Sequence, residues 1–333
     1  MAQTIYAELV DLSDVPALET GLGEAGTFSA KVVKGRRYWY FQPARSVAVT
    51  GQRYVGSETD ELLQRIAKHW EAKREQSAQR AMVRSLVHAY GLPAPLRAVG
   101  QVVQGLAHSG MFRRGVLVGV AAYQTYAAML GVRLRGALVK KSDVNAAQFL
   151  SVSITVVDDA DSAEKILLAI DKSFRKIPGP RDSESTQYIS SQLVRVDFSI
   201  PYRAADSDDP LYMQAPATDT MRSLDFLIQE PVRAVLLHGS GAGVTVPSPE
   251  RFAVHQLIQS CRGKSSQTTV NKELQRAASL LTVLLQKRPD DLKRVSDEAM
   301  HRGPKWREQL LEGIGQLPVS IQEGLRASGI NSV

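Results

Sequence analysis

The spacing of hydrophobic positions separates the chain into a short N-terminal part, a mixed middle and a helical end. A basic and aromatic run at residues 34–42 alternates with the two-residue period of a β-strand, and residues 52–56 complete an expected hairpin. Apolar positions then recur at helical spacing from Thr59 towards His88, which predicts a long helix. The Gly/Pro-rich residues 91–95 end this first part.

Helical and strand patterns alternate through the middle of the chain. Helices are expected at residues 96–108, 119–131 and 162–174, strands at 115–118, 149–157 and 193–198, and a second hairpin over 232–246. Polar segments at residues 178–186 and 201–218 are expected to be loops. This alternation predicts an α/β domain, in the broad sense that includes α+β proteins with a mixed sheet.

Only helical patterns follow. Helices are expected at residues 249–261, 271–286 and 290–300, with a last one beginning near Pro304. The predicted organisation is an N-terminal accessory segment of hairpin and long helix (residues 1–90), an α/β domain (residues 91–262) and a C-terminal helical region (residues 263–333).

Composition favours a soluble protein and leaves its partners open. The net charge is +7, from 41 Lys and Arg against 34 Asp and Glu, which fits either simple solubility or a polyanionic partner. Cys261 is the single cysteine, which excludes an intramolecular disulfide or a multi-cysteine zinc site and suits the cytoplasm. The acidic N-terminus does not have the pattern of a secretory signal, and the longest apolar stretch, residues 116–130, is short for a membrane span.

Two glycine-rich patterns do not predict nucleotide binding. Residues 21–26 fit GxGxxG, but no apolar strand precedes them and no helical pattern follows, as a dinucleotide site requires. Residues 239–243 lie between two strand-like runs, which favours a hairpin turn over a phosphate-binding loop.

A different group of residues points to phosphate and metal chemistry. Gly119 lies where an expected strand becomes a helix, and such a turn lets a phosphate approach the helix N-terminus. Asp143 and Asn145 are two residues apart, so in an extended chain they share one face, and Asp197 lies on the polar face of a later strand. Carboxylates on neighbouring strands can hold Mg²⁺ ions that neutralise phosphates. Spacing alone is equally compatible with a solvated loop aspartate and an unrelated strand aspartate.

Several short motifs together resemble a known family. They occupy residues 37–40, 53–56, 112–115, 147–149, 196–198, 224–227, 230–234 and 249–255. With residues 117–197, they resemble the DNA-polymerase-β-like nucleotidyltransferase superfamily. They are most similar to a bacterial family of nucleotidyltransferase-fold proteins, with distant similarity to abortive-infection and toxin-type transferases. The resemblance implies a mixed-sheet nucleotidyltransferase core and a cytoplasmic role in a toxin–antitoxin or phage-defence setting.

The resemblance also implies functional residues. It makes Asp143, Asn145 and Asp197 the catalytic and metal-binding positions, for Mg²⁺ or Mn²⁺, with Asp197 activating the acceptor. The nucleotide-binding positions that it implies, for a nucleoside triphosphate substrate, are Gly119, Val120, Lys141, Ser142, His255, Arg262 and Lys272. The acceptor would be a hydroxyl of RNA, protein or a small molecule, and neither the acceptor nor any partner protein is specified.

The sequence departs from the family pattern at the positions nearest the chemistry. Asn145 replaces the second aspartate of an Asp-x-Asp metal motif, which removes one negative charge from a dication site. Lys141 replaces an expected small hydroxyl residue, Val120 an expected Ser or Thr, and Gln256 an expected lysine. These departures favour natural divergence over an engineered Asp→Asn change. One hypothesis is that Lys140 or Lys141 places an ammonium group where a metal would otherwise bind.

Three readings of function therefore remain open, the third being a toxin or defence component whose activity requires a partner. The first is a metal-dependent nucleotidyltransferase with a degenerate site, and the second is a catalytically silent module that binds nucleotide, nucleic acid or protein with the same fold.

Simpler structural roles remain for the other candidates. His255 and Arg262 could be ordinary helix-face residues, and Lys272 an exposed partner of Glu273. Asp158, Asp159 and Asp161 are explained by helix capping, and Cys261 by a buried thiol. The run from Arg36 to Phe41 suits nucleic acid, but alternation sends Tyr38 and Tyr40 to one face and Trp39 and Phe41 to the other, so at least one set is expected in the core.

Overall fold

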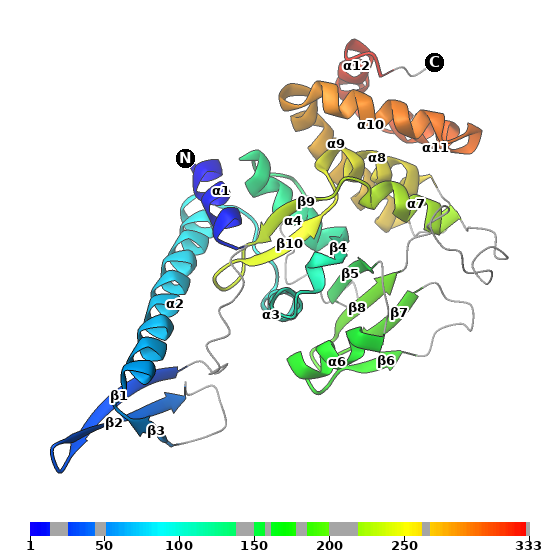
Figure 1. Cartoon of the computed structure of the whole chain (residues 1–333). Helices are drawn as coiled ribbons and strands as arrows, with labels where there is room; N and C mark the ends of the chain where they lie inside the picture. The colour runs from blue at the N-terminus through cyan, green and yellow to red at the C-terminus, as the bar shows by residue number, and fades with distance from the viewer. Residues whose placement is uncertain are drawn as a thin grey trace.

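A computed structural model gives the arrangement of the expected elements. It describes residues 1–13, 26–43, 51–137, 150–156, 161–177, 185–199, 219–261 and 267–330. Its mixed content of helices and strands, with a mixed sheet, confirms the predicted fold class (Figure 1). In the described part of the chain, no helix combines the length and apolar character needed to cross a membrane.

The middle of the chain forms a five-stranded mixed sheet. Its strands are β4 (Gly115–Val118), β5 (Leu150–Val156), β6 (Arg175–Ile177), β7 (Ser185–Ile189) and β8 (Val194–Ser199). The order is β4-β5-β8-β7-β6, and only the β5–β8 pair is parallel. The parallel pair places the strand with Asp197 directly beside the strand that follows Asp143 and Asn145 in the sequence.

One face of this sheet is apolar and covered. Val152, Ile154, Val194 and Val196 are buried on it, as the alternating pattern predicts. Helices α3 (Arg97–His108) and α6 (Asp161–Ile170) contact each other there, and α3 also contacts β5. A Cβ on Gly105 would lie 2.5 Å from Ile170, so glycine is what allows the two helices to approach. The other face carries the polar side chains.

A second, two-stranded sheet lies next to β4. Strands β9 (Val232–Leu236) and β10 (Ala242–Val246) form the expected antiparallel hairpin, and Gly239 and Gly241 adopt positive φ in its turn. Residues 239–241 therefore lie in the expected hairpin turn, and residues 242 and 243 begin β10. Helix α4 (Gly119–Leu130), which ends at Gly131 in the left-handed conformation, packs on β4, β5 and β9.

The first helix of the chain, α1 (Ala2–Leu12), covers β9 and α4. The Tyr6 hydroxyl donates to the carbonyl of Val235 (3.1 Å) and accepts from its N–H (2.9 Å), so it satisfies both backbone groups of that residue. The sequence pattern did not reveal this helix.

The C-terminal half is a group of helices around α8 (Pro249–Ser260), of which only one side chain is not buried. The other helices are α7 (Asp219–Ile228), α9 (Gln267–Lys287), α10 (Pro289–His301), α11 (Pro304–Gly315) and α12 (Val319–Ala327). The expected final helix is in fact two, because Leu317 and Pro318 interrupt it. Helix α7 was not expected either.

The N-terminal strands and long helix have a core of their own. Strands β1 (Gly26–Val33), β2 (Arg36–Pro43) and β3 (Arg53–Ser57) form an antiparallel sheet on α2 (Asp60–Arg84), which continues into a π-helical turn at Ser85–Ala89. Phe28, Trp39 and Phe41 pack on Leu62 and Ile66 of α2. In Figure 1, this sheet lies at the end of α2 that points away from the five-stranded sheet.

Two further expectations required correction at the strand level. The expected hairpin of residues 34–56 is a three-stranded sheet, because Gly26–Val33 adds a strand whose tight turn is Lys34-Gly35. That strand starts at Gly26, the last glycine of the GxGxxG pattern, so no helix follows the pattern. The expected loop at residues 178–186 runs into β7 at Ser185, since the short β6–β7 hairpin has too little apolar periodicity to be recognised.

Candidate functional site

The polar face of the five-stranded sheet aligns three of its features in one row. The cross-strand register pairs Val118 of β4 with Ser153 of β5, and Ser153 with Asp197 of β8. Gly119 follows Val118 directly and opens α4 with φ of +73°, a conformation that side-chain-bearing residues rarely adopt. The expected strand-to-helix turn therefore lies at the same level of the sheet as Asp197.

Asp197 is held by two neighbours on this face. Its Oδ2 accepts a hydrogen bond from Ser151 Oγ at 3.3 Å, and its Oδ1 accepts one from Arg195 Nε at 3.2 Å. The Arg195 guanidinium also donates to Gln187 Oε1 on β7. The carboxylate of Asp197, with its side chain 19% exposed, is therefore neutralised by a cation from its own strand.

The sequence contains a local signal for this arrangement. Arg195 and Asp197 are two residues apart in an alternating strand, as are Ser151 and Ser153, so each pair must share a face. Strand alternation alone thus predicts a basic and hydroxyl-bearing surface around Asp197.

The turn also leaves room beside the backbone. A Cβ added to Gly119 would meet only Ser153 Oγ, at 4.0 Å, which is ordinary contact distance. Val120, in the first turn of α4, is half-buried. The first N–H groups of a helix have no partner within the helix, so this end of α4 can donate hydrogen bonds to an anion.

Asp143, Asn145, Lys141 and Ser142 lie outside the described residues, as do Lys140 and Arg262. The chain that enters this segment is nevertheless fixed. Tyr123 Oη donates to the Arg135 carbonyl (2.7 Å) and Gln124 Nε2 to the Ala137 carbonyl (2.9 Å). Residue 150 begins β5 on the far side of the segment. Both ends of the segment with Asp143 and Asn145 are thus anchored to α4 and to the sheet.

A divalent cation would need ligands from that segment. Across the described ranges, no group of three His, Cys, Asp or Glu side chains could hold a metal ion. Asp197 alone offers one carboxylate, and an arginine already pairs with it. Mg²⁺ prefers six oxygen ligands and usually more than one carboxylate, so the described residues by themselves do not fit it.

His255 faces the protein interior on α8. It is 7% exposed, and its Nε2 lies 2.8 Å from Ser223 Oγ of α7 and 3.1 Å from Gln259 Nε2. Gln259 Nε2 also donates to Ser223 Oγ at 2.7 Å. This nitrogen therefore takes part in joining α7 to α8, which is the helix-face role left open by the sequence.

Lys272 is exposed on α9, next to a half-buried Glu273. Burial raises the pKa of Glu273, and the charge of Arg276 partly offsets that rise. Helix α9 also contacts the chain that leaves α4, since Ser279 Oγ accepts a hydrogen bond from the Arg135 N–H at 3.0 Å. Lys272 is thus on a helix that contacts the approach to residues 138–149.

Burial raises the pKa of the Cys261 thiol. A raised pKa lowers the thiolate fraction at neutral pH, so the thiol is a poor nucleophile. Asp158 and Asp159 lie outside the described residues, and Asp161 begins α6.

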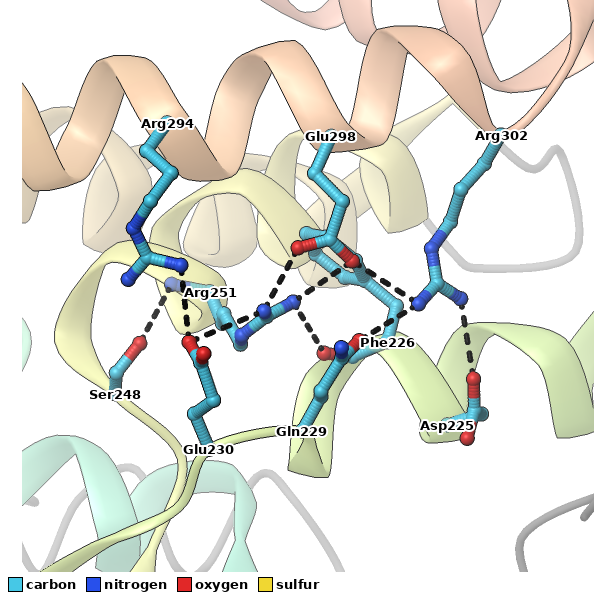
Figure 2. Close-up of polar contacts among 9 residues, drawn as sticks. All are labelled: Asp225, Phe226, Gln229, Glu230, Ser248, Arg251, Arg294, Glu298 and Arg302. Atoms are coloured by element: carbon cyan, nitrogen blue, oxygen red, sulfur yellow. Dashed lines mark hydrogen bonds and ion pairs between the residues drawn. The ribbon is translucent and has the colours of Figure 1, made fainter.

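The most extensive polar network in the C-terminal half surrounds Arg251 of α8 (Figure 2). This arginine is 1% exposed and donates to both carboxylate oxygens of Glu298 on α10 (3.2 and 2.7 Å), to Glu230 (3.4 Å) and to the Phe226 carbonyl (3.3 Å). Arg302 donates to Glu298 at 3.1 Å, and both guanidinium groups lie 5.1 Å from the Phe226 ring centroid. The network joins α7, α8 and α10.

These residues explain three of the sequence motifs. The motifs at residues 224–227, 230–234 and 249–255 supply Phe226, Glu230 and Arg251 to the one network in Figure 2. The side chains at residues 251, 255 and 259 are successive positions four apart, and so lie along one face of α8. Their shared role is to pack α8 against its neighbours.

The comparison with family models supports the resemblance at the level of a nucleotidyltransferase family. Residues 97–301 match the model of a family described as nucleotidyltransferase. A crystal structure of an antigenic nucleotidyltransferase-like protein from Paracoccidioides brasiliensis is similar to this chain at 13% identity, over 66% of this chain and 94% of that chain, with a TM-score of 0.33. No curated protein sequence matches the chain.

Proposed function

Because this chain belongs to the nucleotidyltransferase family whose model covers residues 97–301, we propose that it binds a nucleoside triphosphate on the polar face of the mixed sheet. There a hydroxyl of the acceptor would attack the α-phosphorus, so that a new O–P bond forms as the bond to the β-phosphate breaks and pyrophosphate leaves. The observation that supports this site is the single row formed by the Gly119 turn, Ser153 and Asp197. It sets an anion-accepting helix end beside a carboxylate, which is the pairing that phosphoryl chemistry uses.

In this proposal the residues of the chain position the substrates and neutralise the phosphate charge. They form no covalent bond with the substrates. The N–H groups at the start of α4 receive phosphate oxygens, and the open side of Gly119 lets the triphosphate approach. Asp197 accepts the proton of the attacking hydroxyl, and Asp143, with Asn145 as a neutral neighbour in the sequence, is the second carboxylate that the resemblance assigns to this site. If Mg²⁺ or Mn²⁺ binds to Asp143 and Asp197, it supplies neutralisation of phosphate charge.

The pairing of Asp197 with Arg195 sets a condition on this mechanism. While Arg195 Nε donates to Oδ1, that oxygen cannot also ligate a cation or accept a substrate proton without competition. Both side chains are partly exposed, at 32% and 19%, so we expect the competition to be modest, at most about 1 kcal/mol. Arg195→Ala should therefore tighten Mn²⁺ binding by up to about fivefold in calorimetry.

Labelled nucleoside triphosphates, offered with total RNA and total protein in the presence of Mg²⁺ or Mn²⁺, test the proposal. The parent chain is compared with Asn145→Asp and Asp197→Ala, and Asp297→Ala serves as a matched control because it removes an exposed carboxylate from α10. Transfer by the parent that Asp197→Ala abolishes and Asp297→Ala leaves unchanged would support the enzyme. Transfer that persists in Asp197→Ala would refute the assigned site.

A second candidate function follows from the neutralised carboxylate and from Asn145. A site with one carboxylate replaced and another paired with arginine suits a protein that binds nucleotide without turning it over. Such a protein should bind nucleotide equally well in chelator, and transfer should then require Asn145→Asp. Nucleotide binding that disappears in chelator would exclude this second candidate.

A further inference from the structure

The outer face of the three-stranded N-terminal sheet exposes a group of tyrosines. The register places Tyr40 of β2 opposite Tyr54 of β3, and Tyr38 lies two residues before Tyr40. The Tyr54 ring lies 5.6 Å from that of Tyr40 and 6.3 Å from that of Tyr38. Tyr54 is 56% exposed, and the other two are half-buried. The three rings form one aromatic cluster on the face opposite α2.

This face is separate from the hydrophobic core of the same sheet. Strand alternation turns Phe28, Trp39 and Phe41 towards α2, where they are at most 8% exposed. The tyrosines are consequently not required to hold the sheet on its helix. Removing Tyr38 or Tyr40 from the surface should leave that core intact.

Positive charge surrounds the tyrosine cluster. Residues 26–57 contain six Lys and Arg and no Asp or Glu, so this stretch carries +6 where the whole chain carries +7. Lys31 pairs with Tyr38 in the sheet register, and its Nζ lies 4.8 Å from the centroid of the Tyr40 ring. Arg36 shares the face of Tyr38, and Lys34 forms the β1–β2 turn. The surface thus combines aromatic rings with an excess of positive charge, of which Arg37 is paired with Glu58 (3.4 Å) just beyond this stretch.

We propose that this outer face binds single-stranded nucleic acid, with bases stacked on Tyr38, Tyr40 and Tyr54 and phosphates near Lys31 and Arg36. Aromatic side chains on a basic sheet offer stacking for unpaired bases and attraction for the backbone, which are the two contributions that single-strand binding requires. Charge and exposed rings together select this occupant, because phosphates complement the positive charge and unpaired bases can stack on the three tyrosines. Binding here needs neither nucleoside triphosphate nor metal, and is independent of the transferase proposal.

Fluorescence anisotropy on the full chain tests the proposal. The probes are end-labelled 20-nucleotide poly(U) and poly(dT) and a duplex RNA of the same length, at 50 and 200 mM salt. We expect the single strands to bind more tightly than the duplex, in which base faces are already stacked. Absence of single-strand binding at 50 mM salt, or equally tight duplex binding, overturns the proposal.

Tyrosine variants identify the surface. Each of Tyr38→Ala, Tyr40→Ala and Tyr54→Ala should weaken single-strand binding by about fivefold or more if a base stacks there. Tyr54→Phe keeps the ring and should stay within about twofold of the parent, since stacking rather than the hydroxyl supplies the energy. If the triple alanine variant binds as the parent does, the tyrosine face is not the site.

Charge variants and crosslinking provide independent checks. Lys31→Gln with Arg36→Gln should lower the slope of log affinity against log salt by about 1.4, at about 0.7 per phosphate contact. The matched pair Lys165→Gln with Arg307→Gln removes the same charge from α6 and α11 and should leave the slope unchanged. Ultraviolet crosslinking of 4-thiouridine-containing RNA to the parent chain should label peptides of β2 or β3. Crosslinks confined to other elements would overturn the assignment even if a variant fails to fold.

Discussion

The buried guanidinium of Arg251 offers the sharpest test of how the C-terminal helices are held together. The perturbation is Arg251→Met, which removes the charge and its donors and largely keeps the volume. A buried ion pair that loses one member costs about 3–5 kcal/mol, mainly because the other charge is left without compensation. That figure is an upper bound here, since Glu298 is 29% exposed and still receives a hydrogen bond from Arg302.

The losses that remain can be counted from the contacts. The Phe226 carbonyl loses a buried hydrogen-bond donor, which costs about 1–3 kcal/mol. Glu298 loses a hydrogen bond from a charged donor, and such a bond contributes about 1.5–3 kcal/mol. Because Glu298 can recover water on its exposed side, we expect a total of about 2–4 kcal/mol. Arg251→Ala should cost more, since it adds a cavity. Arg251→Lys should cost less, because an ammonium can still reach one carboxylate.

Urea unfolding followed by circular dichroism measures these differences. Arg294→Met is the matched control, because it removes an arginine from the same network at a position where both Arg294 and its partner Glu230 are more than half exposed. Exposed pairs contribute little, so its midpoint should lie close to that of the parent. If Arg251→Met moves the midpoint no further than Arg294→Met does, burial of the guanidinium does not stabilise the helices and the reasoning is refuted.

The pH dependence gives a second test of the same pair. Burial would raise the pKa of Glu298, but the hydrogen bonds and charges of Arg251 and Arg302 together outweigh it and lower that pKa. A carboxylate with a lowered folded-state pKa stabilises the protein above its unfolded value of about 4.3, and this contribution is lost as pH falls through the folded value. The difference between the parent and Arg251→Met should therefore shrink below about pH 4.3. An unchanged difference would show that the ion pair contributes nothing.

Three further predictions concern contacts outside this network. Tyr6→Phe should lower stability by about 1–3 kcal/mol in urea unfolding, because it leaves both backbone groups of Val235 without their hydroxyl partner. Gly313→Ala should cost about 1–3 kcal/mol, since its Cβ would lie 2.7 Å from a backbone oxygen of α8, whereas Gly315→Ala has nothing within 4 Å and should be nearly neutral. Thr59→Ala should cost about 1 kcal/mol in thermal unfolding, because the threonine hydroxyl caps the first turn of α2. The stabilising role of each contact would be contradicted if Tyr6→Phe were as stable as the parent, if the two glycine changes had equal effects, or if Thr59→Ala left stability unchanged.

The local sequence pattern predicted those helices and strands whose boundaries are set by residues close together in the chain. The strand before Gly119 is uniformly apolar and the glycine needs positive φ, so both the strand and the start of α4 could be placed. Helix α8 was predicted by Pro249 at its first turn, and the structure adds Ser248 as its cap. In each case the residues that define the boundary are adjacent in the chain.

Elements defined by distant partners could not be placed in the same way. Helix α1 is stable because Tyr6 satisfies the backbone of β9, a contact 229 residues away, and nothing in the first residues signals it. Helix α7 has its inner face set by His255 and Arg251 of α8, so its apolar positions alone did not distinguish it from a loop. Strand β6 has only three residues and exists because β7 pairs with it.

The candidate site was predictable in part for a related reason. Asp197 could be placed on a polar strand face from alternation, and the structure puts it level with Gly119. The same alternation places its cationic partner, Arg195, on that face. The positions of Asp143 and Asn145 depend on a segment outside the described residues, so their assignment to the site stays a prediction.

The positions of the motif residues in the fold help to distinguish a transferase from a protein that only binds nucleotide. The motifs at residues 224–227, 230–234 and 249–255, which contribute to the resemblance, converge on helix packing around Arg251. Three of the four departures, at Val120, Lys141 and Asn145, fall instead where phosphate or metal would bind, by the resemblance, and the fourth, Gln256, lies in the buried helix α8. Substitutions in the packed core usually destabilise a fold, whereas substitutions at a ligand site need not. A chain that retains the packing residues and changes residues at the ligand positions can therefore keep the same fold. For this reason Asn145→Asp is an informative restoration: on a stable scaffold, a failure to gain transfer would point to Arg195 or Lys141 as a further block rather than to a collapsed fold.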